Sequence, residues 1–116
     1  MQDKTTMNIE DLPSGVTIVR FDGDLDSLGT HTVQKTFESA LSSRAMRVIV
    51  DLAQVEFISS AGMAMLLVRG KTLRRGGGWL AIAGANRRVS EVLSLAGFHE
   101  LFEVYPTVDA AVEAAG

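Results

Sequence analysis

Two adjacent serines, Ser59 and Ser60, follow an apolar segment and precede a helical pattern, and they are the side chains best placed for chemistry. A serine at a helix start commonly caps the helix by accepting a hydrogen bond from a free backbone N–H. A hydroxyl there can also carry a phosphate, because the free N–H groups and the helix dipole stabilise the dianion. From its position alone, Ser60 is either a helix cap or a phosphate acceptor.

Other residues that could bind a metal have unsuitable spacing. His31 and His99 are far apart in the sequence and have no cluster of further ligands around them. Asp22, Asp24 and Asp26 lack the following glycine and the distant glutamate of a calcium loop. We expect the histidines on the surface and the aspartates in a turn that caps the next helix. No metal site is predicted.

The sequence also lacks the usual elements of an active site. The glycines at 76–78 have neither the spacing nor the lysine of a phosphate-binding loop, and we expect them to end a helix. No Ser-His-Asp arrangement with a nucleophile elbow is visible. The absence of cysteine excludes disulfides and thiolate chemistry. We therefore predict no enzyme activity, no catalytic residue and no cofactor.

Charge and hydropathy limit the partners. The net charge is −3, whereas a nucleic-acid partner requires a basic face, and the arginine pairs at 74–75 and 87–88 are too short to supply one. The N-terminus has no apolar signal segment. The longest stretch without a polar side chain, 61–68, is far shorter than the ~20 residues that span a bilayer. We expect a cytoplasmic protein that neither binds nucleic acid nor inserts into a membrane.

The apolar pattern predicts strands that alternate with helices. A turn at 13–15 joins the first two strands, so these should pair antiparallel. Helices separate the later strands, which implies parallel pairing with right-handed crossovers. The expected strands are 5–10, 16–21, 46–52, 79–83 and a short last one at 101–104, and the expected helices are 28–43, 60–75, 87–96 and 106–115.

These elements amount to a single α/β domain over residues 1–116. Its sheet should be mixed, with four or five strands, and about four helices should cover it. We expect one core built from apolar residues of the central strands and helices: Ile18, Val48, Ile49, Val50, Leu66, Leu67, Ile82 and Leu93.

Four motifs, in order, resemble the STAS domain family, which is named for sulfate transporters and anti-sigma factor antagonists. They are Gly-Asp-Leu-Asp at 23–26, Asp-Leu-Ala-Gln-Val-Glu-Phe-Ile-Ser-Ser-Ala-Gly-Met at 51–63, Gly-Gly-Trp-Leu-Ala-Ile-Ala-Gly at 77–84 and Leu-Ala-Gly-Phe at 95–98. The resemblance covers nearly the whole chain and is to the anti-sigma factor antagonist type. It implies a STAS-like fold and a phosphorylatable serine at Ser60.

This resemblance implies a protein-binding switch. Such a protein binds an anti-sigma factor that is also a serine kinase with a histidine-kinase-like ATPase fold, and so releases the sigma factor. Phosphorylation of Ser60 would end the binding, and a PP2C-type phosphatase would restore it. Ser59 replaces the usual family aspartate, which makes it a rival acceptor, and Ala61 replaces a frequent serine or threonine. The alternative is a non-switching STAS adaptor subunit of a lipid transporter or a stress-signalling assembly.

The loops that carry these motifs should meet, because the carboxyl ends of parallel strands lie at one edge of a sheet. Arg87 and Arg88 would stand there in the first turn of a helix, where the dipole disfavours cations. They are either tolerated surface residues or contacts for an acidic partner or for the kinase's nucleotide phosphates. The predicted partner-binding residues are Asp24, Asp26, Ser59, Ser60, Met63, Asn86 and Arg87.

Overall fold

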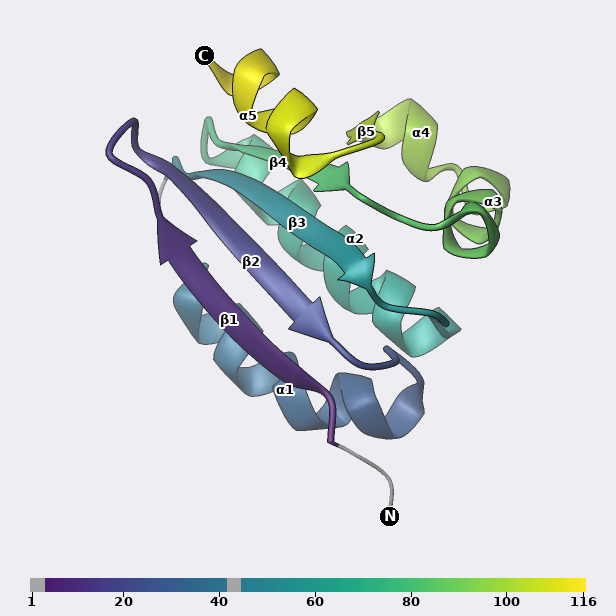
Figure 1. Cartoon of the computed structure of the whole chain (residues 1–116). Helices are drawn as coiled ribbons and strands as arrows, with labels where there is room; N and C mark the ends of the chain where they lie inside the picture. The colour runs from purple at the N-terminus through teal and green to yellow at the C-terminus, as the bar shows by residue number, and fades with distance from the viewer. Residues whose placement is uncertain (1–3, 42–44) are drawn as a thin grey trace.

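The structure is a computed structural model that describes residues 4–41 and 45–116. Within these ranges the chain forms one five-stranded sheet and five helices, drawn in Figure 1. The elements are β1 (Thr6–Asp11), β2 (Val16–Asp22), α1 (Ser27–Ala40), β3 (Arg47–Gln54), α2 (Ser60–Arg75), β4 (Trp79–Ala83), α3 (Arg87–Leu95), α4 (Phe98–Leu101), β5 (Glu103–Tyr105) and α5 (Val108–Ala115). The predicted α/β class is confirmed.

The strand order across the sheet follows the chain, β1-β2-β3-β4-β5. β1 and β2 are antiparallel, and the turn between them contains Gly15 with a left-handed φ of 93°. β2, β3, β4 and β5 are parallel neighbours. Parallel neighbours need a crossover connection, which the helices supply. The sheet is therefore mixed, as the sequence predicted.

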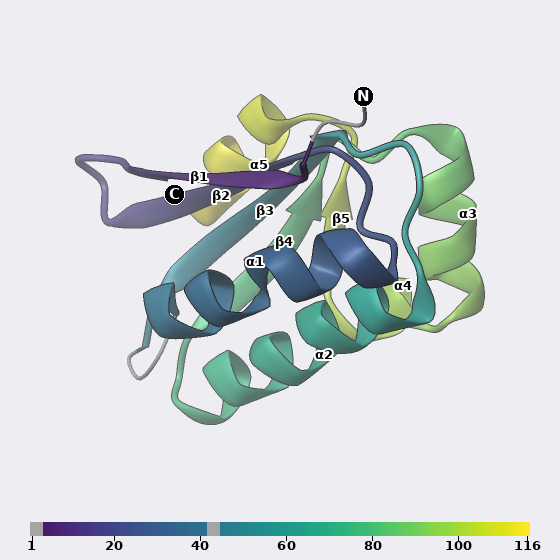
Figure 2. The same ribbon diagram turned by 90° about the horizontal axis from the view of Figure 1, so that it is seen from below.

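Helices cover both faces of the sheet. α1 and α2 lie side by side on one face, and α5 lies on the other (Figures 1 and 2). Figure 2 shows that α1 and α2 run in the same direction, since each follows a parallel strand. Their first turns therefore lie at the same edge of the sheet. No helix of the described ranges is long and apolar enough to cross a membrane.

Two hydrophobic layers form instead of one core. The layer under α1 and α2 holds most of the expected core residues, namely Val48, Val50, Leu66, Ile82 and Leu93. Ile18 and Ile49 face the opposite side and pack in a smaller layer with residues of α5. The expectation of a single core is wrong, because consecutive strand residues point to opposite faces and both faces are covered. Leu67, also expected in the core, is half-buried.

The segment after α3 differs from the prediction. Gly97 has a φ of 86° and ends α3, as expected for a glycine at this position. The buried rings of Phe98 and Phe102 then pack with their centroids 5.6 Å apart. The short helix α4 occupies this segment, so the last strand begins at Glu103 and not at 101. The first helix ends at Ala40 with Leu41 as its cap, so its predicted extension to Ser43, which lies outside the described residues, is wrong.

Candidate functional site

Three loops meet at the edge where the parallel strands end. The loop after β2 is hydrogen-bonded to the loop after β3. The Leu25 N–H donates to the Phe57 carbonyl at 2.9 Å, and Leu25 forms an isolated parallel β-bridge with Ile58. The loop after β4 joins them through Asn86, whose Nδ2 donates to the Val55 carbonyl at 3.3 Å. The predicted meeting of these loops is confirmed. They form the candidate site.

Ser59 is the residue that caps α2. Its Oγ accepts a hydrogen bond from the Gly62 N–H at 3.2 Å and donates one to the Leu25 carbonyl at 2.8 Å. Its backbone N–H donates to the same carbonyl at 2.9 Å. Ser59 is half-buried and extended, with φ −92° and ψ 173°, as a cap residue should be. The interpretation of Ser60 as the cap is therefore wrong by one residue.

Ser60 is the first residue of α2 and is exposed to solvent. Among the described residues, no hydrogen bond engages its hydroxyl, whereas the Ser59 hydroxyl donates one hydrogen bond and accepts another. The first turn of α2 contains no acidic side chain. A phosphate on Ser60 would therefore meet the uncompensated positive end of a helix.

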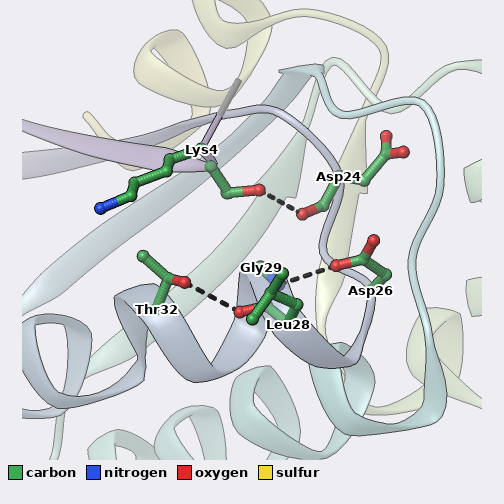
Figure 3. A pocket seen from close by; sticks show the side chains of 7 residues that line it. Lys4, Asp24, Asp26, Leu28, Gly29 and Thr32 are labelled. Carbon is green, nitrogen blue, oxygen red and sulfur yellow. Dashed lines mark hydrogen bonds between the residues drawn. The ribbon is translucent and has the colours of Figure 1, made fainter. Parts of the chain in front are cut away.

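Asp24 and Asp26 lie in the loop that precedes α1. Asp26 caps this helix, since its Oδ1 accepts from the Gly29 N–H at 2.7 Å, as the sequence predicted for this turn. The backbone carbonyl of Asp24 accepts a hydrogen bond from Thr5 Oγ1 at 2.6 Å. Its side-chain carboxylate takes no part in this bond and is exposed. Figure 3 shows both carboxylates on one side of a pocket, with Lys4 on the other. The pair gives this part of the edge a negative charge.

The remaining predicted residues divide into structural and exposed ones. Asn86 caps α3, since its Oδ1 accepts from the Val89 N–H at 2.8 Å while its Nδ2 holds the β3–α2 loop. Met63 is half-buried and packs against the main hydrophobic layer. The Arg87 side chain is 92% exposed and forms a loose pair with Glu91, with Nε and Oε2 3.5 Å apart. Arg87 therefore remains available to a partner, because exposed pairs of this kind are weak.

Asp51 has a role that the sequence reading missed. This buried carboxylate accepts from the Ala53 N–H at 2.9 Å through Oδ1, and its Oδ2 lies 3.3 Å from Nε of Arg20 on the neighbouring strand. Arg20 also pairs with Glu10 at 2.8 Å, and this hydrogen bond, with the nearby carboxylates, raises the Arg20 pKa. The ion pairs connect β1, β2 and β3 just before the site. Only the predicted adjacency of β2 and β3 could have indicated this contact.

Comparison with known proteins places this geometry in a family. The family model for the STAS domain matches residues 9–111. The anti-sigma F factor antagonist of Paenibacillus polymyxa is 31% identical over 101 residues, which cover 86% of this chain and 84% of that protein. The crystal structure of an anti-sigma factor antagonist from Mycobacterium paratuberculosis superposes with a TM-score of 0.85 at 24% identity, covering 96% of this chain and 93% of that one.

Three further solved structures come from two kinds of protein. The anti-sigma factor antagonist SpoIIAA in its unphosphorylated form matches with a TM-score of 0.78 at 18% identity, covering 95% of this chain and 96% of that one. SpoIIAA of Bacillus has also been solved in its phosphorylated form. The STAS domain of a SulP transporter from Vibrio cholerae matches with a TM-score of 0.75 at 28% identity, covering 90% and 83% of the two chains. By fold, motifs and sequence similarity, this chain belongs to the STAS domain family.

Proposed function

We propose that this protein is an anti-sigma factor antagonist whose binding is switched by phosphorylation of Ser60. One observation carries the proposal: the Ser60 hydroxyl is exposed at the start of α2 and forms no hydrogen bond with the residues that the structure describes, because Ser59 performs the capping. The related anti-sigma factor antagonists, one of them solved in a phosphorylated form, support it. The protein acts by binding in the cytoplasm and catalyses no reaction.

In the unphosphorylated state, the loop edge around Ser60 binds an anti-sigma factor that is also a serine kinase with a histidine-kinase-like ATPase fold. This binding removes the anti-sigma factor from its sigma factor. The partner contacts the exposed groups of the three loops, which include Asp24, Ser60 and Arg87. In the complex, the Ser60 oxygen attacks the γ-phosphorus of ATP, ADP leaves, and a base of the kinase takes the hydroxyl proton.

Phosphorylation ends the binding through charge at one residue. The phosphate adds about −1.5 to −2 charges at pH 7. In the free domain, the N–H groups at the start of α2 and the surrounding water stabilise this charge. In the complex, the dianion loses its water and faces the phosphates of the bound nucleotide, so its burial costs several kcal/mol. A cost of this size lowers affinity a hundredfold or more. A PP2C-type phosphatase removes the phosphate and restores binding.

Phosphate mapping with purified proteins tests the acceptor. We expect a kinase-type anti-sigma factor from the same genome, with ATP, to add one phosphate, and tandem mass spectrometry to place it on Ser60. The Ser60→Ala variant should remain unmodified. Ser59→Ala is the matched control and should still be phosphorylated, since its hydroxyl is used in capping. A phosphate on Ser59, or full modification of Ser60→Ala, would overturn the assignment.

The second candidate function is a non-switching adaptor. The similarity to a STAS domain of a SulP transporter and the presence of Ser59 in place of the family aspartate favour it. An adaptor would hold its partner regardless of the charge at Ser60. Equal binding of the Ser60→Glu variant and the wild type to an isolated partner would therefore select this candidate.

A further inference from the structure

We propose that Leu28 is an apolar anchor of the interface around Ser60, and that the anti-sigma factor meets it with an apolar patch flanked by cationic groups. This inference rests on the proposed function and extends the binding surface from α2 to the outer side of α1. Leu28 is the second residue of α1, and its side chain is 72% exposed. Isolated exposed leucines are common, so the proposal depends on the surroundings of this residue.

Leu28 stands at the rim of a concave surface. A pocket of about 190 Å³ lies beside it, as Figure 3 shows. The other lining residues are Lys4, Thr5, Asp24, Asp26, Gly29 and Thr32. An apolar side chain next to a polar hollow allows a partner to bury the side chain while its own polar groups enter the hollow. Interfaces usually obtain most of their binding energy from a few such anchors.

The backbone that carries Leu28 is held rigidly. A Cβ at Gly29 would lie 2.1 Å from the Asp24 carbonyl oxygen and 2.5 Å from Thr5 Oγ1, so the first turn of α1 packs directly on the preceding loop and on the start of β1. The Asp26 cap and the hydrogen bond between Thr5 and Asp24 fix the same turn. A preorganised anchor loses little conformational freedom on binding, which favours affinity.

The charge around Leu28 identifies the chemistry of the partner. Asp24 and Asp26 line the pocket beside Leu28, and the cation Lys4 lies on the opposite side of this pocket. None of these carboxylates forms an ion pair with a residue that the structure describes. Cationic side chains placed over Asp24 and Asp26 would complement this surface and accelerate association. The hydrogen bonds between Leu25 and Ser59 hold the loop that precedes α1 beside the start of α2, which allows one interface to cover both helix starts.

A pair of leucine truncations tests the anchor. We expect Leu28→Ala, and also Leu28→Gln, to weaken calorimetric binding of the unphosphorylated protein to a kinase-type anti-sigma factor at least tenfold. Leu95→Ala is the matched control, because Leu95 is 90% exposed in the last turn of α3, and it should change affinity less than twofold. Thermal melts should show that all three variants fold. Asp24→Asn should reduce the salt dependence of binding.

The outcomes separate this inference from the proposed function. If phosphorylation of Ser60 weakens binding but both Leu28 variants bind within twofold of the wild type, the anchor is overturned and the switch stands. Equal losses for Leu28→Ala and Leu95→Ala would also overturn the anchor. If the wild type binds none of the kinase-type anti-sigma factors of its genome, the proposed function and this inference both fail.

Discussion

The first turns of α1 and α2 are built alike but differ in charge. Each contains a buried apolar residue, a capping residue, an exposed serine and a glycine two positions later. Asp26 Oδ1 accepts from the Gly29 N–H at 2.7 Å in α1, and Ser59 Oγ accepts from the Gly62 N–H at 3.2 Å in α2. One cap is thus a carboxylate and the other a hydroxyl. The segments read Leu-Asp-Ser-Leu-Gly from 25 and Ile-Ser-Ser-Ala-Gly from 58.

This difference changes the electrostatic environment that a phosphate would meet at each helix start. In α1 the carboxylate of Asp26 already compensates the positive end of the helix, so a phosphate on Ser27 would meet a like charge. In α2 the cap is neutral and the first turn has no acidic residue. A phosphate on Ser60 would therefore find free N–H groups without a carboxylate on its own helix. The comparison favours Ser60 over Ser27, although both serines are exposed first residues of neighbouring helices.

The largest expected effect concerns the two glycines. Gly29→Ala should lower the free energy of unfolding by about 3 kcal/mol, because the new Cβ would lie 2.1 Å from the Asp24 carbonyl oxygen. Gly62→Ala should cost about 1–2 kcal/mol, since its Cβ would lie 2.8 Å from the Leu25 carbonyl oxygen and alanine favours helix. Urea denaturation measures both.

Gly76→Ala is the control for these variants. Gly76 has a φ of −85°, and a Cβ there would lie 3.6 Å from its nearest neighbour, the Leu73 carbonyl oxygen. The free energy of unfolding should therefore change by no more than about 0.5 kcal/mol. A Gly62→Ala variant that is less stable than Gly29→Ala would show that the α2 start is the tighter of the two turns.

Phosphorylation of Ser60 should separate binding from stability. It should weaken partner binding at least tenfold, or about 1.4 kcal/mol, while the free domain keeps its stability or gains about 0.3–1 kcal/mol. Ser60→Glu should act in the same direction but less strongly, because it adds a single charge. Calorimetric titration and thermal melts of the same samples decide this. A phosphorylated protein that melts much lower would indicate a switch by unfolding, and unchanged affinity would remove the switch.

Local signals in the sequence predict the elements well where they are unambiguous. The bounds of α2 and β4 follow from the apolar runs and from the three glycines that end α2, and Asn86 marks the start of α3. The family motifs indicate the loops that meet. α4 was missed because it is only four residues long and lies where the sequence predicted the start of a strand, although Phe98 and Phe102 have the spacing of neighbours on a helix.

The position of the α2 cap was predicted to within one residue, and the roles of the other site residues in binding and phosphorylation stay predictions. Ser59 and Ser60 are equally good cap residues by type, and only the extended backbone of Ser59 and its bond to Leu25 assign the cap. The ion pair between Asp51 and Arg20 joins two strands, so it depends on the sheet register. The cap assignment and this ion pair both depend on contacts between residues far apart in the sequence, so the spacing of neighbouring residues could not predict them.

Removal of the two caps should have intermediate effects. Ser59→Ala should lower the free energy of unfolding by about 1–2 kcal/mol, because it removes the bonds to the Gly62 N–H and to the Leu25 carbonyl. Asp26→Ala should cost about 1 kcal/mol through the loss of one capping bond. Ser60→Ala is the matched control and should change stability by less than about 0.5 kcal/mol. A larger loss for Ser60→Ala than for Ser59→Ala in urea denaturation would return the capping role to Ser60.

The smallest expected effect comes from making the two helix starts alike. Ser59→Asp places a carboxylate cap on α2 but loses the hydroxyl donor to the Leu25 carbonyl, so these opposing effects should leave the unphosphorylated domain within about 0.5 kcal/mol of the wild type. The phosphorylated form should differ more. The new carboxylate would stand beside phosphorylated Ser60 and cancel the 0.3–1 kcal/mol or so that the helix start gives to the phosphate. Thermal melts of phosphorylated and unphosphorylated samples of both proteins measure this difference. If phosphorylation stabilises Ser59→Asp as much as the wild type, the neutral cap does not favour a phosphate at the start of α2. The difference in cap charge between α1 and α2 would then have no effect on phosphorylation.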